Sequence, residues 1–337
     1  MKDKRNLLVL LILAVVCLSV FLPGWSRVFA RAANGFFDVY LPLVARQSIP
    51  TPTPTPTPPP TPTPTPKPTP TLPPPEAGWL AYLNYQRALA DLPPLIEEPA
   101  WSSGCWDHAR YIVKNDVLLH DEDPANPWWT EAGDAAAASS NLMASYNVNA
   151  TDWEAIDTFM TAPFHAVGIL DPEFLRTGFG SFREAGAGFQ MAAALDVLRG
   201  LGSIPPEVQF PIFWPADGMT TLLTSHVGEY PDPLTSCAGY TLPSGLPIIL
   251  QLGDGSLTPN VTAHDFSQNG APLEHCLFDE TSYINPDGYW QELGRAILDA
   301  RDAMVLIPRQ PLIAGTSYTA SITVNGQTYS WTFSVGD

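Results

Sequence analysis

One histidine, His165, lies where a helix is expected to begin. Pro163 is tolerated only in the first turn of a helix, so a short helix is predicted to start at Thr161 or Pro163. This start places His165 in the first turn, at the positive end of the peptide dipoles, where a cation is disfavoured. The imidazole is therefore expected to stay neutral, able to accept a hydrogen bond or to bind a metal ion.

A longer helix is predicted just before this histidine. Thr151 and Glu154 have the spacing of a capping box, which opens a helix. One apolar stripe follows at helical spacing: Trp153, Ile156, Phe159 and Met160. After His165, Asp171-Pro172 is expected to end the second helix, and residues 177–180 are predicted to begin a strand. Two helices and a strand would thus position the histidine.

Four pieces of sequence, in order, resemble the bacterial form of the CAP superfamily, the family of cysteine-rich secretory proteins, antigen 5 and pathogenesis-related 1 proteins. The main piece is FMTAPFHAVGILDPEFLRTGFG at 159–180, with an aromatic residue, Met, Pro, His, Ile-Leu and a Gly-x-Gly strand. The others are YLNYQR at 82–87 followed by LPPL at 92–95, His120, and SSNL at 139–142, where the family has Gly-Glu-Asn-Ile. The resemblance covers about residues 76–200 and implies a three-layer α-β-α sandwich.

The resemblance also implies that His120 and His165 face one cavity together with acidic residues. Two histidines and one carboxylate can hold zinc, because imidazole nitrogen and carboxylate oxygen suit its tetrahedral preference. Ser140, however, stands where the family has its glutamate, so Glu122 or Glu131 would have to supply the carboxylate. A ligand-binding pair and a purely structural pair of histidines both stay open, and any zinc is expected to be weakly held.

Three further residues, His108, Ser140 and Cys105, carry side chains that can take part in chemistry. His108 lies on the apolar stripe of a helix predicted over 99–116, where a single inward histidine is more often a hydrogen-bonded core residue than a ligand. Ser140 could lie near the histidines, but no Gly-x-Ser-x-Gly motif occurs, and Cys105 faces the core of the same helix. The cavity or ligand-binding candidates are therefore His120, His165, Glu122, Ser140 and His108, with no catalytic nucleophile.

Residues 1–75 contain little that could build a core. Residues 1–32 combine a basic start with an apolar run and predict a secretory signal peptide or an uncleaved anchor. A short apolar segment follows at 33–49, and 50–75 is a Thr-Pro repeat that favours an extended linker. We therefore expect a secreted or surface-displayed protein that reaches the membrane only through residues 1–32, if these are retained.

The charge of the chain excludes several classes of partner. It has 16 basic and 34 acidic residues. Without residues 1–32, 11 basic residues stand against 33 acidic ones, a net charge of −22. Such a surface repels phosphate backbones and anionic lipid headgroups, so binding to nucleic acid or peripherally to a membrane is not expected.

Residues 205–337 carry a different pattern, of short strands and turns. Asn325-Gly326 separates two alternating apolar runs, which is the strongest short signal for a β-hairpin. An immunoglobulin-like β-sandwich is predicted here, after a CAP domain over 76–204. Residues 208–214 could instead add a strand to the first domain, and 290–300 could be a helix or an irregular insert. In an oxidising compartment Cys237 and Cys276 are expected to be disulfide-bonded, leaving Cys105 free.

The sequence thus predicts an α+β protein, with an α-β-α sandwich followed by a small antiparallel β-sandwich. The leading functional hypothesis is a non-enzymatic extracellular module that binds a small apolar ligand, a lipid or a cell-wall component. One alternative is a metal-assisted hydrolase that uses His120 and His165. Another is an adhesion protein that acts through its C-terminal β-sandwich, because folds of this kind carry several functions.

Overall fold

The computed structural model describes residues 69–337. The predicted leader or anchor at 1–32, the apolar segment at 33–49 and most of the linker at 50–75 lie outside the described residues. Within 69–337, no helix has both the length and the apolar character needed to cross a bilayer. Residues 69–337 belong to one compact unit.

The described chain mixes helices and strands, as the α+β prediction requires. The helical segments are η1 (Pro75–Ala77), α2 (Gly78–Ala88), α3 (Pro99–Asn115), α4 (Glu131–Ala137), α5 (Asp152–Thr161), α6 (Pro163–Ile169), η2 (Pro233–Ser236) and α7 (Gly288–Asp299). All but η2 and α7 precede residue 170, and most strands follow it.

Local sequence signals explain where the helices around His165 begin. Thr151 and Glu154 form the predicted capping box at the start of α5, each side chain bonding the other residue's backbone N–H. Pro163 is the first residue of α6, as predicted. It fits there because its missing N–H would have had no partner within the helix. The predicted α5–α6 pair and the position of His165 in the first turn are confirmed.

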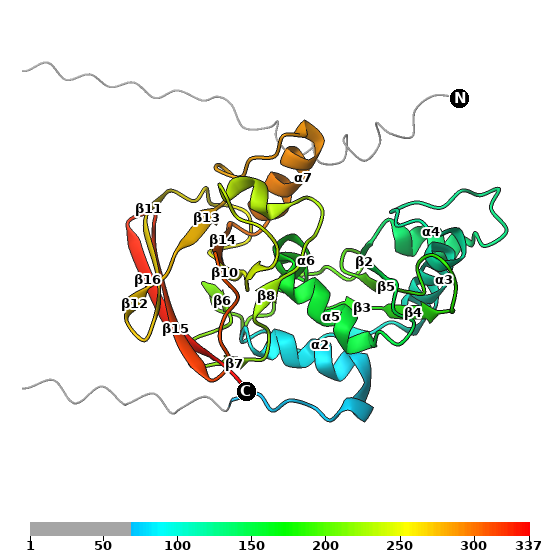
Figure 1. Ribbon diagram of the computed structural model, residues 1–337, viewed down its shortest axis with the longest axis horizontal. Coiled ribbons are helices and arrows are strands. Elements are labelled where there is room, and N and C mark those ends of the chain that lie inside the picture. The colour runs from blue at the N-terminus through cyan, green and yellow to red at the C-terminus, as the bar shows by residue number, and fades with distance from the viewer. Residues whose placement is uncertain (1–68) are drawn as a thin grey trace, which may run out of the picture. The chain divides into compact units, whose positions relative to one another are not determined.

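A three-stranded antiparallel sheet lies beside these helices, in the order β2 (Ser140–Ser145), β5 (Met191–Asp196) and β4 (Phe179–Arg183). Its central strand β5 is buried along its whole length. Ala192 and Ala194 pack with residues of α3 and α4, whereas Met191, Ala193 and Leu195 join the apolar core that contains α2, α5 and α6. Because side chains alternate across a strand, helices cover both faces of the sheet (Figure 1).

The glycines of the Gly-x-Gly motif are required by the packing of α3. A Cβ atom on Gly178 would lie 2.4 Å from the backbone nitrogen of Ser102, and one on Gly180 would lie 2.1 Å from that of Trp106. The backbone of α3 therefore rests directly on the strand, and no other residue type fits at either position without moving the helix.

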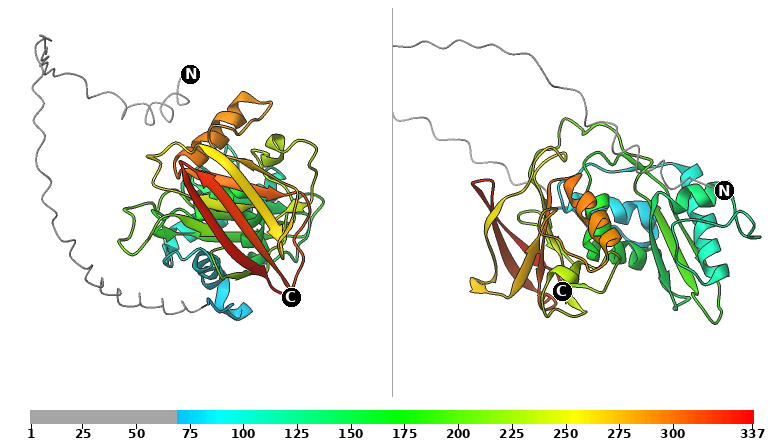
Figure 2. Two further views of the ribbon diagram at one scale, coloured as in Figure 1. Left: turned by 90° about the vertical axis from the view of Figure 1, so that its left-hand side faces the viewer. Right: turned by 90° about the horizontal axis from the view of Figure 1, so that it is seen from above.

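Two larger sheets follow in the second half of the chain. The four-stranded sheet has the order β13 (His275–Phe278), β14 (Ala303–Pro308), β10 (Ile248–Gln251) and β6 (Ile212–Trp214). The five-stranded sheet has the order β12 (Ala271–Pro272), β11 (Val261–Gln268), β15 (Thr316–Val324), β16 (Gln327–Val335) and β7 (Thr220–Thr221). The left view of Figure 2 looks onto the second sheet, whose long strands run from yellow to red. All neighbours in both sheets are antiparallel except β16 and β7, which are parallel.

Three expectations for this half can be compared with the strands. Asn325-Gly326 forms the tight turn between β15 and β16, with φ angles of 50° and 78°. Residues 208–214 contribute β6 to the four-stranded sheet and not to β2-β5-β4. Residues 290–299 belong to the helix α7, and Ala300 is its C-cap, so the segment is not an irregular insert. Two short pairs complete the strands: β1 (Ile96–Glu97) with β3 (Arg176–Thr177), and β8 (Ser225–His226) with β9 (Ser244–Gly245).

One buried apolar core extends through both halves of the described chain. Polar contacts join the halves as well. Gln251 on β10 donates to the carbonyl oxygen of Leu170 at 3.1 Å, and Arg301 forms an ion pair with Asp171 at 2.6 Å. Both charged side chains of that pair are at most 10% exposed. The segment that ends α6 is therefore held by residues about 80 to 130 positions later in the chain.

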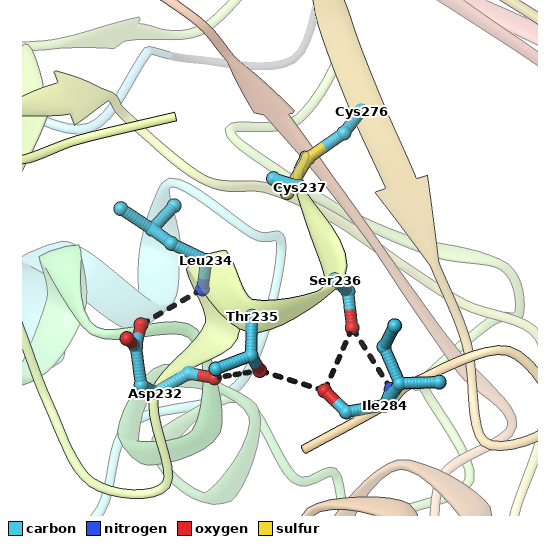
Figure 3. The surroundings of a disulfide bond; sticks show 7 residues. All are labelled: Asp232, Leu234, Thr235, Ser236, Cys237, Cys276 and Ile284. Atoms are coloured by element: carbon cyan, nitrogen blue, oxygen red, sulfur yellow. Dashed lines mark hydrogen bonds between the residues drawn. A yellow bond between two sulfur atoms is a disulfide. The ribbon is translucent and has the colours of Figure 1, made fainter. Parts of the chain in front are cut away.

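The predicted disulfide is present between Cys237 and Cys276, whose Cα atoms lie 5.6 Å apart. Figure 3 shows its surroundings, where η2 leads into Cys237. Ser236 accepts a hydrogen bond from the backbone N–H of Ile284, and Thr235 donates one to the carbonyl oxygen of the same residue. The bond and these contacts connect η2 to β13 and to the chain before α7. Cys105 is free and buried, also as predicted.

Candidate functional site

The carboxylate partner of His165 is Glu229, a residue that the sequence analysis did not single out. Its Oε2 lies 2.7 Å from Nδ1 of His165. The same carboxylate accepts hydrogen bonds from the backbone N–H groups of Phe164 at 3.1 Å and His165 at 3.3 Å. Ala162, the residue before α6, provides no side-chain cap. Glu229 therefore supplies the missing cap of α6, where the peptide dipoles favour a negative charge.

The pair is oriented so that one ring nitrogen of His165 remains available. The Glu229 side chain is 1% exposed and that of His165 is 17% exposed. A carboxylate accepts hydrogen bonds, so Nδ1 of His165 carries the proton in this contact. Nε2 of His165 has no hydrogen-bond partner within residues 69–337. This ring nitrogen is therefore left for a hydrogen bond to another molecule.

His120 lies near this pair but is held separately. Its Nδ1 is 3.0 Å from the carbonyl oxygen of Ala137, at the end of α4. The residue keeps an exposed surface, yet the protein around the ring removes enough water to lower its pKa, and the charges of His165 and His108 lower it further. The imidazole of His120 is therefore neutral at neutral pH, and it lies close enough to both other histidines to sense their charge.

Glu122 does not supply the carboxylate for this site. It pairs with His108, whose Nδ1 lies 2.8 Å from Oε1 of Glu122, and both side chains are fully buried. The second nitrogen of His108 lies 3.0 Å from the carbonyl oxygen of Leu119, and Oε2 of Glu122 accepts from the N–H of Thr130. Burial lowers the pKa of His108 to about 4 and raises that of Glu122 to about 7. Every polar atom of this pair has a partner, which agrees with a core role for His108.

The remaining candidates also lie away from the His165 ring. Ser140 is 5% exposed, and its hydroxyl oxygen lies 3.7 Å from the sulfur of Cys105. Burial raises the pKa of that thiol to about 12, so it is not a thiolate at neutral pH. Glu131 is exposed at the first residue of α4, and no residue of the described chain bonds its carboxylate. Asn141, next to Ser140, does reach the site, since its amide donates to the carbonyl oxygen of His165 at 3.3 Å.

These groups do not fit a zinc site with three protein ligands. Across residues 69–337, no three or more His, Cys, Asp or Glu side chains are grouped so as to hold a metal ion. The oxygens of Glu229 are already bonded to the backbone of α6 and to Nδ1 of His165. This carboxylate therefore orients the imidazole ring and is not free to bind a metal ion. Only His165 and His120 could offer free nitrogens. A tetrahedral structural or catalytic zinc needs at least three protein ligands.

A separate hollow lies at the entrance to α5. Its volume is about 570 Å³, within the range of ligand pockets, and it is open to solvent. Two tryptophans form its apolar walls: Trp79, whose ring packs 5.4 Å from that of Phe179, and Trp153, stacked 4.1 Å from Tyr82. The other lining residues are Pro75, Gly78, Val148, Asn149, Ala150, Thr151, Asp152 and Arg183. None of the sequence-predicted site residues lines this hollow.

The polar side of this hollow is held rigidly. Arg183 pairs with Asp152 at 2.7 Å and donates to the carbonyl oxygen of Ala150 at 2.8 Å. The indole N–H of Trp153 is buried and has no hydrogen-bond partner within residues 69–337. Trp153 was predicted on a helical stripe, where spacing alone cannot separate a core side chain from a pocket wall.

Comparison with known proteins gives a limited likeness. No family model matches the chain, and no curated protein matches it. Among solved structures, an extracellular protein containing an SCP domain from Bacillus anthracis str. Ames is similar to part of the chain, with 16% sequence identity and a TM-score of 0.28. The likeness covers 36% of this chain and 39% of that one. The chain thus spans well under half the length of that protein.

Proposed function

We propose that residues 76–204 are a CAP-type module that works outside the cell and binds a small apolar ligand in the hollow between Trp79 and Trp153. The single observation that carries the proposal is the pair of tryptophan walls around a volume of about 570 Å³. Pockets of this size bind small molecules mainly through aromatic and apolar walls, with a few fixed polar groups for orientation. Asp152 and Arg183 are such groups, since each is bonded to the other.

Three features of the fold support the CAP type within this proposal. The motif residues at 159–180 form α5, α6, β3 and β4. Gly178 and Gly180 let the backbone of α3 pack directly against the strand. Asn141 donates a hydrogen bond to the carbonyl oxygen of His165. Helices cover both faces of the sheet that contains the motif strand. Helices on both faces of this sheet support the proposal of a CAP-type α-β-α arrangement.

The histidines have a structural role in this proposal. Glu229 and His165 connect the start of α6 to the second half of the chain, and Glu122 and His108 close the layer of α3 and α4. A buried polar pair of this kind is costly to break, because each partner leaves the other unsatisfied. The secreted location is proposed from the residues at 1–32 and from the net charge of −18.

The ligand itself provides the test. We would purify the protein from the medium of a secreting host, extract it with organic solvent and identify the bound species by mass spectrometry. Val148→Trp fills the hollow from its rim without removing a core side chain, and Trp106→Leu changes an exposed tryptophan on α3 as the matched control. The parent and Trp106→Leu should carry the same apolar compound, and Val148→Trp should carry less than a tenth as much. Equal amounts in all three proteins would refute the proposed pocket.

A further inference from the structure

Two histidines meet between the sheets of the second half, far from His165 in sequence. Nδ1 of His264, on β11, lies 2.9 Å from Nε2 of His275, the first residue of β13. The two rings are nearly perpendicular, at 78°, with centroids 5.0 Å apart. The strands β11 and β13 contact each other although they belong to different sheets (Figure 1). His264 is exposed and His275 is half-buried, so a dissolved ion can reach the pair.

The backbone fixes which nitrogen of His275 is free. Nδ1 of His275 lies 2.7 Å from the carbonyl oxygen of Leu273, which can only accept, so Nδ1 carries the proton. Nε2 therefore bears the lone pair and faces His264. Histidines that bind metals are almost always held in this way, with the other ring N–H donated to a carbonyl or carboxylate. Phe266 supports the ring from the core side, with centroids 6.2 Å apart.

Nδ1 of His264 lies beside Nε2 of His275, so both nitrogens could bind one ion if the lone pair of Nδ1 were free. His264 lies two residues before Phe266 on β11, hence on the same face of the sheet, and Phe266 is fully buried there. In the structure its Nδ1 donates to Nε2 of His275. Moving the single proton of the neutral ring to the solvent-facing Nε2 frees the Nδ1 lone pair without any net loss of a proton.

We propose that His264 and His275 form a binding site for one divalent transition-metal ion of the copper(II) class, held by Nδ1 of His264 and Nε2 of His275. Two nitrogens that occupy neighbouring corners of a square-planar site, each about 2.0 Å from the metal, lie about 2.8 Å apart, whereas two tetrahedral corners lie about 3.3 Å apart. The observed separation of 2.9 Å is that of the hydrogen bond between the rings, and it is also close to the square-planar spacing, so an ion could replace the shared proton with little movement of the two nitrogens. Copper(II) is also the divalent ion that imidazole sites bind most tightly in the first transition series.

The charge around the pair favours the ion. The chain has a formal net charge of −18, which raises the local concentration of cations. Two protein ligands leave the other positions of the ion to water, which sets the expected affinity below that of three-histidine sites.

Copper(II) titration of the untagged full-length protein tests the site. Calorimetry gives the stoichiometry and affinity, and electron paramagnetic resonance counts the imidazole nitrogens bound to copper. The variants are His264→Gln, His264→Arg and His275→Gln, with circular dichroism to show that each is folded. The double variant His120→Gln/His165→Gln is the matched control. It also separates this site from the histidines near the proposed ligand-binding module.

The parent and the control should bind one copper ion through two imidazole nitrogens. Each of the three single variants should bind at least about tenfold more weakly and show one imidazole at most. Copper binding that is unaffected by the single variants would overturn the proposal. So would a parent that binds no copper, or binds it through a single imidazole, because the pair would then be only a hydrogen bond between two rings.

Discussion

Glu229 lies 2.7 Å from His165 although 64 residues separate them in the sequence. Its carboxylate performs two tasks at once, since it caps α6 at the backbone N–H groups of Phe164 and His165 and orients the imidazole ring. The start of α6 thus depends on a residue from the second half of the chain.

Replacing Glu229 by alanine should therefore destabilise the protein. The change removes a buried cap and leaves two backbone donors and Nδ1 of His165 without their acceptor, at a cost of about 1–3 kcal/mol. Urea unfolding of the parent and the variant gives the difference in free energy. Glu207→Ala, at an exposed glutamate, should change stability by less than about 0.5 kcal/mol. Equal effects of the two substitutions would contradict the capping role.

The buried pair of Glu122 and His108 predicts a pH dependence with a definite sign. The pKa of Glu122 is raised in the folded protein from 4.5 to about 7, so folding favours its protonated form. That contribution is complete below pH 4.5 and is lost as the pH rises through 7. Glu122→Gln should thus cost more stability at pH 4.5 than at pH 8, by up to about 3 kcal/mol.

The comparison requires unfolding curves of both proteins at each pH, because other groups titrate in the same range. His108, whose pKa is lowered to about 4, contributes with the opposite sign, and this contribution is lost as the pH falls from 6.5. Because His108 contacts Glu122 directly, the same curves for His108→Gln and for the double variant separate its contribution. A cost of Glu122→Gln that grows toward alkaline pH would show that the carboxyl is ionised in the folded protein.

The disulfide should be one of the main sources of stability in the second half. Cys237 and Cys276 close a loop of 39 residues, which the chain-entropy model values at about 3–4 kcal/mol. The double variant Cys237→Ser/Cys276→Ser should lose stability of that order in thermal or urea unfolding. Cys105 provides an internal control, because its buried thiol should react with an alkylating reagent only after unfolding. Rapid alkylation of Cys105 in the folded protein would be inconsistent with its burial.

Zinc binding separates a structural role of His120 and His165 from a metal-dependent one. The structure leaves these residues without a third protein ligand, so the double variant His120→Ala/His165→Ala should lower the melting temperature and leave the zinc content unchanged. Elemental analysis of both proteins after equal dialysis measures this. Stoichiometric zinc that disappears in the double variant would show that the two histidines bind the metal with a ligand from water or another molecule.

The sequence predicted those features that depend on neighbouring residues. The capping box at Thr151, the helix start at Pro163 and the hairpin at Asn325 follow from rules that span four residues or fewer. The Cys237–Cys276 bond could be predicted because these are the two cysteines of residues 205–337, a segment expected to be exported.

The site was predicted less well, because its partners come from distant parts of the chain. Glu229 follows a glycine and precedes an exposed tyrosine, and nothing in that context indicates a contact with α6. Glu122 was expected near His165 but is bonded to His108, since both lie in the layer of α3 and α4. The Trp79–Trp153 hollow needs the relative placement of two helices, which helical periodicity does not provide.

Ligand binding in the Trp79–Trp153 hollow is tested most directly by nuclear magnetic resonance of the indole N–H groups. Each tryptophan of the purified protein gives its own signal, assigned by single substitution. Titration with 2-naphthol, a small apolar aromatic alcohol, should shift the signals of Trp79 and Trp153 saturably and leave those of Trp106 and Trp290 unchanged. In Val148→Trp the two shifts should vanish. Signals of Trp79 and Trp153 that do not move, or that move no more than that of Trp106, would contradict the account.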